Sequence, residues 1–235
     1  IDFSKHEDIL EKEHLIQHGF KRPSYMIKSL ECCELDLRKD TIKILSEAKP
    51  KWRYNHKKSL QKEVIVTIET KPEDFVLIND ELALEWEVRN NFQDREVIPL
   101  IKELGDKLIT CKASDKFGNL LGIRVSVISG RRAYHLYNAV SKKGRDYLPG
   151  YRILIFMIDW LRDRDIDYFD IGPTNQKRFP GPYRFKHGIG YKDSMFTCLG
   201  EWDYSNVFFL ERAFNSFIKI YFNSSAFVRK FINNF

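Results

Sequence analysis

The sequence predicts an α/β fold: a mixed, mostly antiparallel sheet flanked by helices, with helical extensions at both ends of the chain. Three apolar segments separated by turn residues, 107–114, 119–129 and 132–140, are typical of an antiparallel meander. An almost continuously apolar segment, 151–163, comes next, followed by a short strand-like segment, 166–172. Because a helix between two strands usually crosses over the sheet, this order predicts a locally parallel pair of strands.

The first third of the chain is expected to combine helices and strands. Residues 4–18 are typical of a helix, and the rough alternation of polar and apolar residues over 24–37 indicates one or two strands. Residues 40–62 are again typical of helical structure, with a break at Pro50. The β-branched segment VIVTIE at 64–69 then predicts a short strand.

Three further segments are expected to be helical. Residues 79–104 predict a helix that Pro99 could interrupt, and residues 206–222 carry an aromatic and aliphatic stripe with helical spacing. The segment 151–163 has an apolar stripe and further apolar residues around it, so we expect this helix to be buried on nearly all sides. Its stripe consists of Ile153, Phe156, Met157, Trp160 and Leu161.

The composition is that of a folded protein that favours anionic partners. Hydrophobic residues make up 43% and aromatic residues 14% of the 235 residues, which is enough for a substantial core. The formal net charge of +6 favours nucleic acid, phosphorylated metabolites or an anionic membrane surface.

The cysteine and histidine spacings predict neither a metal site nor a disulfide framework. The four cysteines include no C-x-x-C pair, and the six histidines have no metal-binding spacing. We therefore expect a reducing, cytoplasmic compartment and no metal cofactor. No apolar run reaches the length of a transmembrane helix.

The segment GPYRFKHGIGYKD at 181–193 alternates aromatic and basic residues between glycines and directly follows the strand 166–172. We expect a bent loop, and ligands of α/β sheets bind beyond the carboxyl ends of strands. The loop could close over a phosphorylated ligand, carry a catalytic lysine, or be a solvated hairpin. Its G-x-G at 188–190 lacks the third glycine of a dinucleotide-binding motif.

A second basic and aromatic segment is KPKWRYNHKKSLQK at 49–62, where Trp52 and Tyr54 lie among six basic residues. Such a segment could bind phosphates while its aromatic rings stack on bases. By itself, however, such a segment is more often a solvated helix face.

Asp170 is the last acidic residue of the strand that ends at Gly172. Its carboxylate could act as a base or orient a substrate. Alternatively, it could cap the following turn through an Asx-type hydrogen bond.

The string YRILIFMIDWLRDRDIDYFDIGPTNQKRFPGPYRFKHGIGYKD, from 151 to 193, resembles the signature of FemABX-type transferases. That family has a buried helix, a strand ending in Asp-x-Gly, and a glycine and aromatic loop that contains Phe-Lys. The matching residues here are Asp170, Gly172, Gly181, Tyr183, Phe185, Lys186 and Gly190. The segments 15–37 and 52–66 resemble the close of the family's first domain and its basic crossover helix.

The resemblance implies a GNAT-type fold, of which FemABX proteins often have two units in tandem. It suggests that residues 1–63 are the remnant of a first unit with the crossover helix, 64–200 the acyltransferase domain, and 201–235 aromatic C-terminal helices. The family transfers an acyl or aminoacyl group to an amine, from acyl-CoA or aminoacyl-tRNA. The acceptor implied is an amine-bearing, phosphorylated cell-envelope or amino-sugar precursor.

If the chain catalyses such an acyl transfer, roles can be suggested for residues of this sequence. Lys186 is expected to stabilise the charge that develops in the reaction, Phe185 to pack the loop, and Asp170 to orient the acceptor or the loop. The residues expected to bind substrate are Tyr183, Arg184, Arg53, Lys57, Lys58, Tyr137 and Lys192.

One departure from the family's pattern concerns the donor. The glycine-rich pyrophosphate loop of GNAT enzymes is not intact in KKGRDYLPGYR at 142–152, although the helix start could still offer amides to an anion. The broken loop favours an alternative function, a non-catalytic module that binds RNA or phosphate. The segment 206–222 could also contact the inner face of a membrane, or pack on the sheet.

Overall fold

The computed structural model describes residues 2–6, 9–23, 31–69, 103–177, 179–190, 194–204, 213–214 and 216–217. The chain divides into two compact units, which are described separately. The larger unit comprises residues 33–172 and 176–195, and the smaller one comprises 1–32, 173–175 and 196–235.

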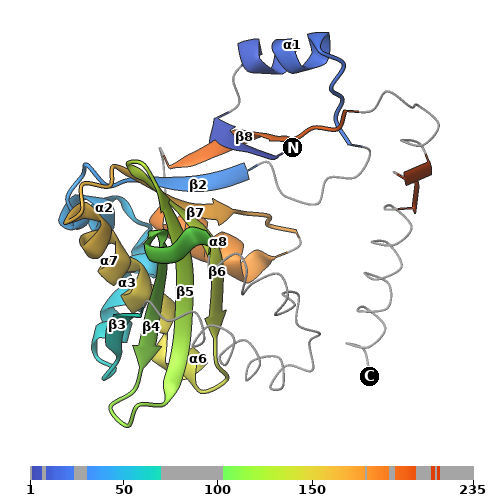
Figure 1. Ribbon diagram of the computed structural model, residues 1–235. Coiled ribbons are helices and arrows are strands. Elements are labelled where there is room, and N and C mark those ends of the chain that lie inside the picture. The colour runs from blue at the N-terminus through green and yellow to red at the C-terminus, as the bar shows by residue number, and fades with distance from the viewer. Residues whose placement is uncertain are drawn as a thin grey trace. The chain divides into compact units, whose positions relative to one another are not determined.

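The larger unit is built on a sheet with the strand order β2-β7-β6-β5-β4-β3 (Figure 1). In chain order these strands are β2 (Glu31–Asp36), β3 (Ile65–Glu69), β4 (Leu108–Ser114), β5 (Leu120–Ser129), β6 (Arg132–Val140) and β7 (Tyr168–Pro173). Strands β3 to β6 pair antiparallel with their neighbours, while β6 and β7 are parallel. The predicted meander, the crossover and the mixed, mostly antiparallel sheet are therefore confirmed.

The parallel pair β6–β7 is short. It runs from Arg132↔Tyr168 to Tyr134↔Asp170, and β6 continues from there to Val140 without a further partner on β7 among the described residues. The carboxyl end of β7 therefore lies where the two strands stop pairing.

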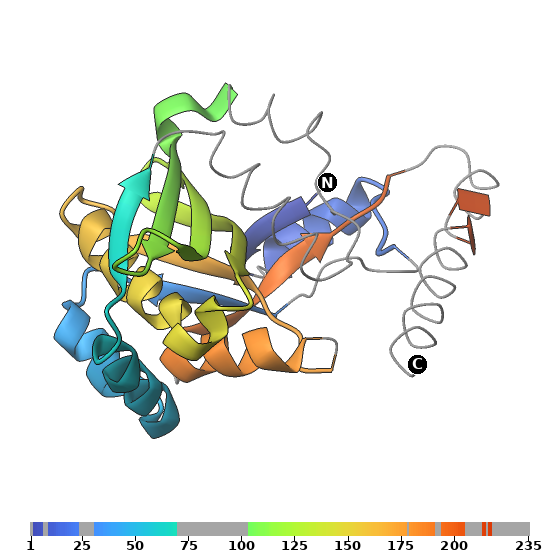
Figure 2. The same ribbon diagram turned by 90° about the horizontal axis from the view of Figure 1, so that it is seen from below.

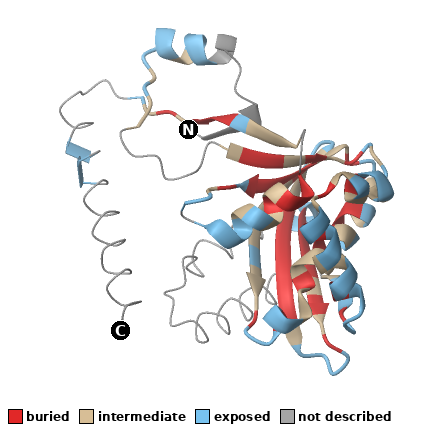
Figure 3. Ribbon diagram, turned by 180° about the vertical axis from the view of Figure 1, so that it is seen from behind, coloured by how far each residue is buried: buried red, intermediate tan, exposed pale blue. Residues whose placement is uncertain are grey.

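Helices cover one face of this sheet, and Figure 2 shows α3, α7 and α8 on the same side. The helices of the larger unit are α2 (Thr41–Glu47), α3 (Pro50–Leu60), α6 (Gly144–Tyr147), α7 (Pro149–Arg162) and α8 (Pro180–Ile189), with a 3-10 turn, η1 (Gly105–Lys107). In the crossover helix α7, Ile153, Met157 and Leu161 of the predicted stripe lie in the main core and are at most 1% exposed. Phe156 is exposed and Trp160 is half-buried, so the expectation that this helix is buried on nearly all sides is wrong. Figure 3 shows that buried residues follow the central strands, while exposed residues lie on the outer faces of the helices.

The predicted helix at 4–18 is only partly right. Residues Asp2–His6 form the strand β1, and the helix α1 is limited to Ile9–Gln17. Within the smaller unit, β1 pairs antiparallel with β8 (Met195–Glu201). Pairing with a strand almost 200 residues away in the sequence therefore overrides the local helical pattern.

Several other predictions fall partly outside the described residues. Of the strand region 24–37, β2 is described and 24–30 is not; the helix expected at 79–104 lies outside except for its last two residues. In the segment 206–222, the described residues 213–214 and 216–217 are helical and exposed.

The expected bent loop at 181–193 is wrong for most of its length, because Pro180–Ile189 form the helix α8. Pro180 occupies the first turn, where a missing N–H costs nothing. Two of the glycines serve close packing: a Cβ on Gly188 would lie 2.7 Å from Trp52 Cδ1, and one on Gly190 would lie 2.3 Å from Cys33 Sγ. These glycines therefore allow α8 to lie close to Trp52 and Cys33. Because the segment is helical, it does not form the solvated hairpin that was one of the alternatives.

The compact units do not test the predicted boundaries at 63 and 200, because contacts within this chain say nothing about a former tandem unit. Those boundaries stay a prediction. In the described part of the chain, no helix combines the length and apolar character that a membrane span requires, and no three His, Cys, Asp or Glu side chains gather as metal ligands would.

The β4–β5 turn depends on one buried carboxylate, Asp115. It accepts hydrogen bonds from the backbone N–H groups of Phe117 and Asn119, both at 2.9 Å, and from Lys143 Nζ at 2.7 Å. The Lys143 ammonium, together with the other donors, holds the pKa of Asp115 well below its usual range.

Replacing Asp115 by asparagine is expected to lower the Tm at neutral pH by several degrees, because the charge-assisted bonds are lost. A depressed carboxyl pKa stabilises the fold above the unfolded pKa of about 3.9, and this contribution is lost as the pH falls further. The Tm difference from the natural chain should therefore shrink below about pH 4. Glu63→Gln is the control, since its ion pair with Lys116 is exposed and should hardly change the Tm; a pH-independent Asp115→Asn difference would contradict the assignment.

Candidate functional site

Lys186 lies in α8 with its side chain inside the larger unit. The residue is 7% exposed, and its Nζ would be 3.2 Å from a Cβ placed on Gly172, at the carboxyl end of β7. Gly172 has φ +90°, so this position favours glycine for its backbone as well as for space. Lysine is rarely buried without a role for its charge, and the ammonium of Lys186 therefore marks the site.

The ring of His135, on β6, lies on the same side of Gly172. The same hypothetical Cβ would lie 3.0 Å from His135 Cδ2. Burial lowers the pKa of His135 well below its ordinary value, and the charges of Arg124 and Lys186 lower it further. The imidazole is therefore neutral at physiological pH, and its Nδ1 is buried with no hydrogen-bond partner among the described residues.

Asp170 contributes a carboxyl group from β7. Its Oδ1 accepts the backbone N–H of Gly172 at 2.7 Å, which is the Asx-type bond considered from the sequence. Burial raises the pKa of Asp170; Glu34 raises it further, whereas Lys186 and Arg132 act in the opposite direction. Asp170 therefore shapes the turn after β7 and faces the charge of Lys186.

Phe185 packs next to Lys186 in α8. Its ring centroid is 5.0 Å from that of Tyr151 in α7 and 5.9 Å from that of Trp52 in α3. These contacts hold α8 against two other helices.

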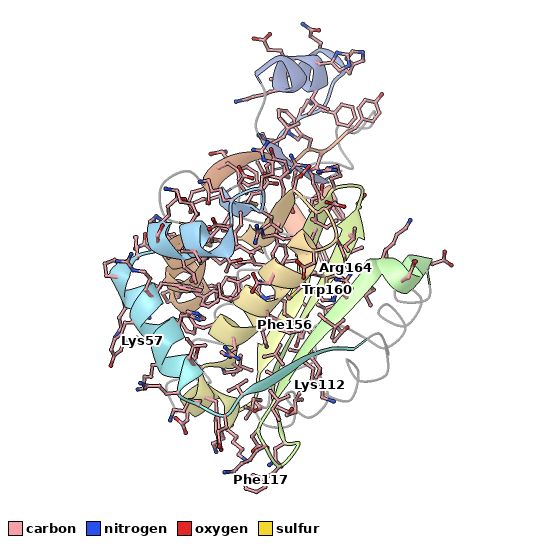
Figure 4. The ribbon with its side chains drawn as sticks, turned by 90° about the vertical axis from the view of Figure 1, so that its left-hand side faces the viewer. Lys57, Lys112, Phe117, Phe156, Trp160 and Arg164 are labelled. Carbon is pink, nitrogen blue, oxygen red and sulfur yellow. The ribbon has the colours of Figure 1, made fainter. Side chains whose placement is uncertain are left out.

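The structure does not bring every predicted binding residue to this cluster. Arg53, Lys57 and Lys58 are exposed on α3, and Figure 4 shows Lys57 on the side of α3 that faces away from the sheet. Arg53 Nη1 donates to Ser46 O at 2.9 Å. Trp52 is buried in the core and offers no face for base stacking, whereas Tyr54 is exposed. The basic segment 49–62 is thus largely a solvated helix face.

The remaining predicted binding residues have separate surroundings. Tyr183 is half-buried beside the ring of His187, and the exposed Arg184 donates from Nε to Pro180 O at 3.1 Å. Tyr137 packs in a second apolar cluster with Ile123 and Val125. Lys192 lies outside the described residues.

Sequence reasoning missed Arg124, Ser126 and His135. Arg124 and Ser126 alternate with apolar residues along β5, a pattern that ordinarily indicates a solvated strand face. In the structure both are buried. The available signal was the central place of β5 in the predicted meander, where neither face was certain to reach solvent.

The first turn of α7 lies where GNAT enzymes bind the pyrophosphate of an acyl-CoA. Pro149 has no N–H, and the N–H of Tyr151 donates to Leu148 O at 3.3 Å. Pro149 is also buried, and its Cγ would lie 3.3 Å from a Cβ on Gly122 of β5. The first turn of α7 thus packs on the sheet and offers few amides to an anion, so these residues fit a pyrophosphate poorly.

Comparison with known proteins found one curated relative, the Lipid II:glycine glycyltransferase of Staphylococcus saprophyticus. The two sequences are 27% identical over 108 residues, which is 44% of this chain. The chain matches about a quarter of that relative, 26% of its length. No protein-family model matches the chain.

Solved structures resemble the fold over more of the chain. The crystal structure of FemX matches 86% of this chain and 70% of its own, with a TM-score of 0.67 and 15% identity. The C-terminal domain of a protein described as a lysylphosphatidylglycerol synthetase from Agrobacterium fabrum matches 80% of this chain and 59% of its own, with a TM-score of 0.50 and 13% identity.

Proposed function

From the premise that this chain is FemABX-like in sequence and GNAT-like in fold, we propose that it is an N-acyltransferase. It moves an aminoacyl or acyl group onto an amine of a cell-envelope precursor. The observation that carries the proposal is the buried Lys186 ammonium at the carboxyl end of β7, beside Gly172 and His135.

Acyl transfer to an amine places negative charge on the carbonyl oxygen. The acceptor nitrogen forms a bond to the carbonyl carbon, the bond from that carbon to the donor's oxygen or sulfur breaks, and the leaving group takes up the proton that the amine releases. A cation held in a site of low dielectric stabilises the intermediate oxyanion more than the neutral ground state, and so accelerates the reaction. Lys186 performs this role, and Phe185 keeps its helix in place.

The acceptor amine must be neutral when it attacks. Asp170 is close enough to Lys186 for its pKa to respond to that charge, and it accepts the N–H of Gly172 in the turn after β7. Its carboxyl group orients the acceptor, or it receives the proton of the amine before that proton reaches the leaving group. The neutral ring of His135 provides polar nitrogen atoms beside Lys186 and adds no positive charge to those of Lys186 and Arg124.

Aminoacyl-tRNA is the favoured donor, with acyl-CoA as the second candidate. The packed start of α7 supports this order, because a CoA pyrophosphate would find few amides there. The curated relative is named for transfer of glycine to lipid II, and this suggests glycine and a lipid-linked acceptor here. The proposed contacts to phosphates of the nucleotide or carrier remain Arg53, Lys57 and Lys58. The other proposed substrate-binding residues remain Tyr183, Arg184, Tyr137 and Lys192.

The proposed reaction takes place in the cytoplasm or at the inner face of the membrane. The segment 206–222 is the proposed membrane contact; among its described residues, Phe214 and Phe217 are exposed.

Transfer of radioactive glycine from glycyl-tRNA to lipid II by the full chain tests the proposal. We expect radioactive glycine in the lipid fraction. When acetyl-CoA with a radioactive acetyl group replaces the tRNA donor, we expect no label there. Transfer from acetyl-CoA would keep the enzyme class and overturn the donor. A chain that binds tRNA with an affinity falling steeply with salt, but transfers nothing from either donor, would instead be the non-catalytic RNA-binding module.

A further inference from the structure

Two polar side chains are buried on β5 without a role in the mechanism above. Arg124 is 4% exposed and Ser126 is fully buried. The Nη1 atom of Arg124 and the Oγ atom of Ser126 are both inaccessible and have no hydrogen-bond partner in the described parts of the chain. Buried polar groups are normally paired, so two adjacent exceptions on one strand call for an explanation.

Arg124 is a cation for which the described residues supply no carboxylate as counter-ion. Burial lowers its pKa to about 10, so it stays charged at neutral pH, and the groups that raise its pKa are the thiols of Cys111 and Cys33. Burial in turn raises the pKa of Cys111 to about 12, so this thiol is not an anion. A buried charge without a counter-ion destabilises a fold and is retained where it serves another purpose.

The two side chains lie next to the Lys186 site. Ser126 pairs across the strands with His135, and the charges of Arg124 and Lys186 both act on the ring of His135. On the helix side, the ring of Phe185 covers Arg124, with 6.0 Å between the guanidinium carbon and the ring centroid. Arg124, Ser126 and His135 thus present unpaired polar atoms beside the lysine.

We propose that Arg124 and Ser126 bind an anionic group of a ligand, a carboxylate or a phosphate, beside Lys186. Both polar atoms are covered in the structure, so binding requires the side chains over them, among them the ring of Phe185 over Arg124, to move aside. The planar guanidinium matches two oxygen atoms of such a group, and the hydroxyl of Ser126 donates to one of them. The proposal deepens the proposed function, since a substrate anchored at Arg124 has its reacting part close to Lys186. Anion binding can nevertheless be measured without acyl transfer.

The test measures the Tm of the full chain in inorganic phosphate, in acetate and in chloride at equal ionic strength. Stabilisation by a ligand follows from its binding to the folded state alone. We expect phosphate or acetate to raise the Tm by several degrees above chloride. A shift with phosphate alone identifies a nucleotide or lipid-carrier phosphate as the natural group, and a shift with acetate alone identifies a peptide carboxylate.

Arg124→Met is expected to abolish the shift without lowering the Tm in chloride, because it removes an unpaired buried charge and keeps the volume. Arg164→Met, the same change at an exposed position over Trp160 (Figure 4), is expected to keep the shift. Ser126→Ala is expected to weaken it. A shift that survives in Arg124→Met, no shift with either anion, or a lower Tm of Arg124→Met in chloride would each overturn the proposal.

The outcomes separate this inference from the proposed function. Glycine transfer without anion binding overturns the anion site and leaves the transferase. Anion binding that depends on Arg124 in a chain that transfers nothing overturns the transferase and leaves the anion site.

Discussion

Replacing Lys186 by alanine is expected to lower kcat for acyl transfer by about 10²–10³-fold, the usual effect of removing one group that stabilises an oxyanion. The ammonium is buried beside Gly172, where low dielectric strengthens its interaction with developing charge. Because the interaction strengthens in the transition state, KM should change much less than kcat. Steady-state kinetics with glycyl-tRNA and lipid II measure both parameters.

Two further variants show whether the loss of kcat is specific to the charge at position 186. Lys107→Met removes a lysine from the exposed turn η1 and should leave kcat unchanged. Lys186→Arg keeps the charge but changes its shape and reach, so we expect partial activity. The Tm of Lys186→Ala is measured as well, so that a loss of activity caused by unfolding is distinguished from a loss of charge stabilisation. Unchanged turnover in Lys186→Ala would remove this residue from the mechanism.

Replacing Gly188 by alanine is expected to destabilise the larger unit by about 1–3 kcal/mol, the usual cost of overpacking a core. The new Cβ would lie 2.7 Å from Trp52 Cδ1 and 3.2 Å from Trp52 Cβ. The indole cannot move aside freely, because it is 3% exposed and packs against Tyr151 and Phe185. Urea unfolding at equilibrium measures the loss, and kcat should fall too because α8 carries Lys186.

Gly181→Ala is the matched control, since it lies in the same helix and its new Cβ would meet nothing within 4 Å. It is expected to stabilise the protein by about 0.4–1 kcal/mol, because alanine has less conformational freedom to lose. In a double-mutant cycle, Trp52→Phe should relieve part of the Gly188→Ala penalty, with a coupling energy of about 0.5–3 kcal/mol. Strict additivity, or equal effects of both glycine substitutions, would show that the contact between Gly188 and Trp52 does not limit the approach of α8.

The central sheet and its crossover could be predicted because their signals are local. The apolar segments of β4, β5 and β6 are separated by short turns, and the apolar stripe of α7 has helical spacing over a full 14-residue helix. Each of these strands and the helix α7 could therefore be recognised from its own residues alone. The parallel pairing of β6 with β7 then follows from the length of the helical connection between them.

The character of α8 could not be predicted, because its glycines have two opposite meanings. In isolation Gly188 and Gly190 indicate a bend, but here they make room for Trp52 and Cys33, which lie far away in the sequence. Arg124 escaped notice for a related reason. An arginine in a strand indicates solvent unless the helices that cover it are known.

The residues that hold α8 in place come from the segment that runs from β2 to α3. Lys49 donates its N–H to Gly188 O, Trp52 fills the space that Gly188 leaves, and Cys33 fills that beside Gly190. In evolutionary terms, we expect the segment 33–60 and α8 to change together. If recombination exchanged only one of these segments with that of a diverged homologue, the ammonium of Lys186 would be displaced although Lys186 itself was unchanged. Substitutions in the two segments should therefore covary among homologues.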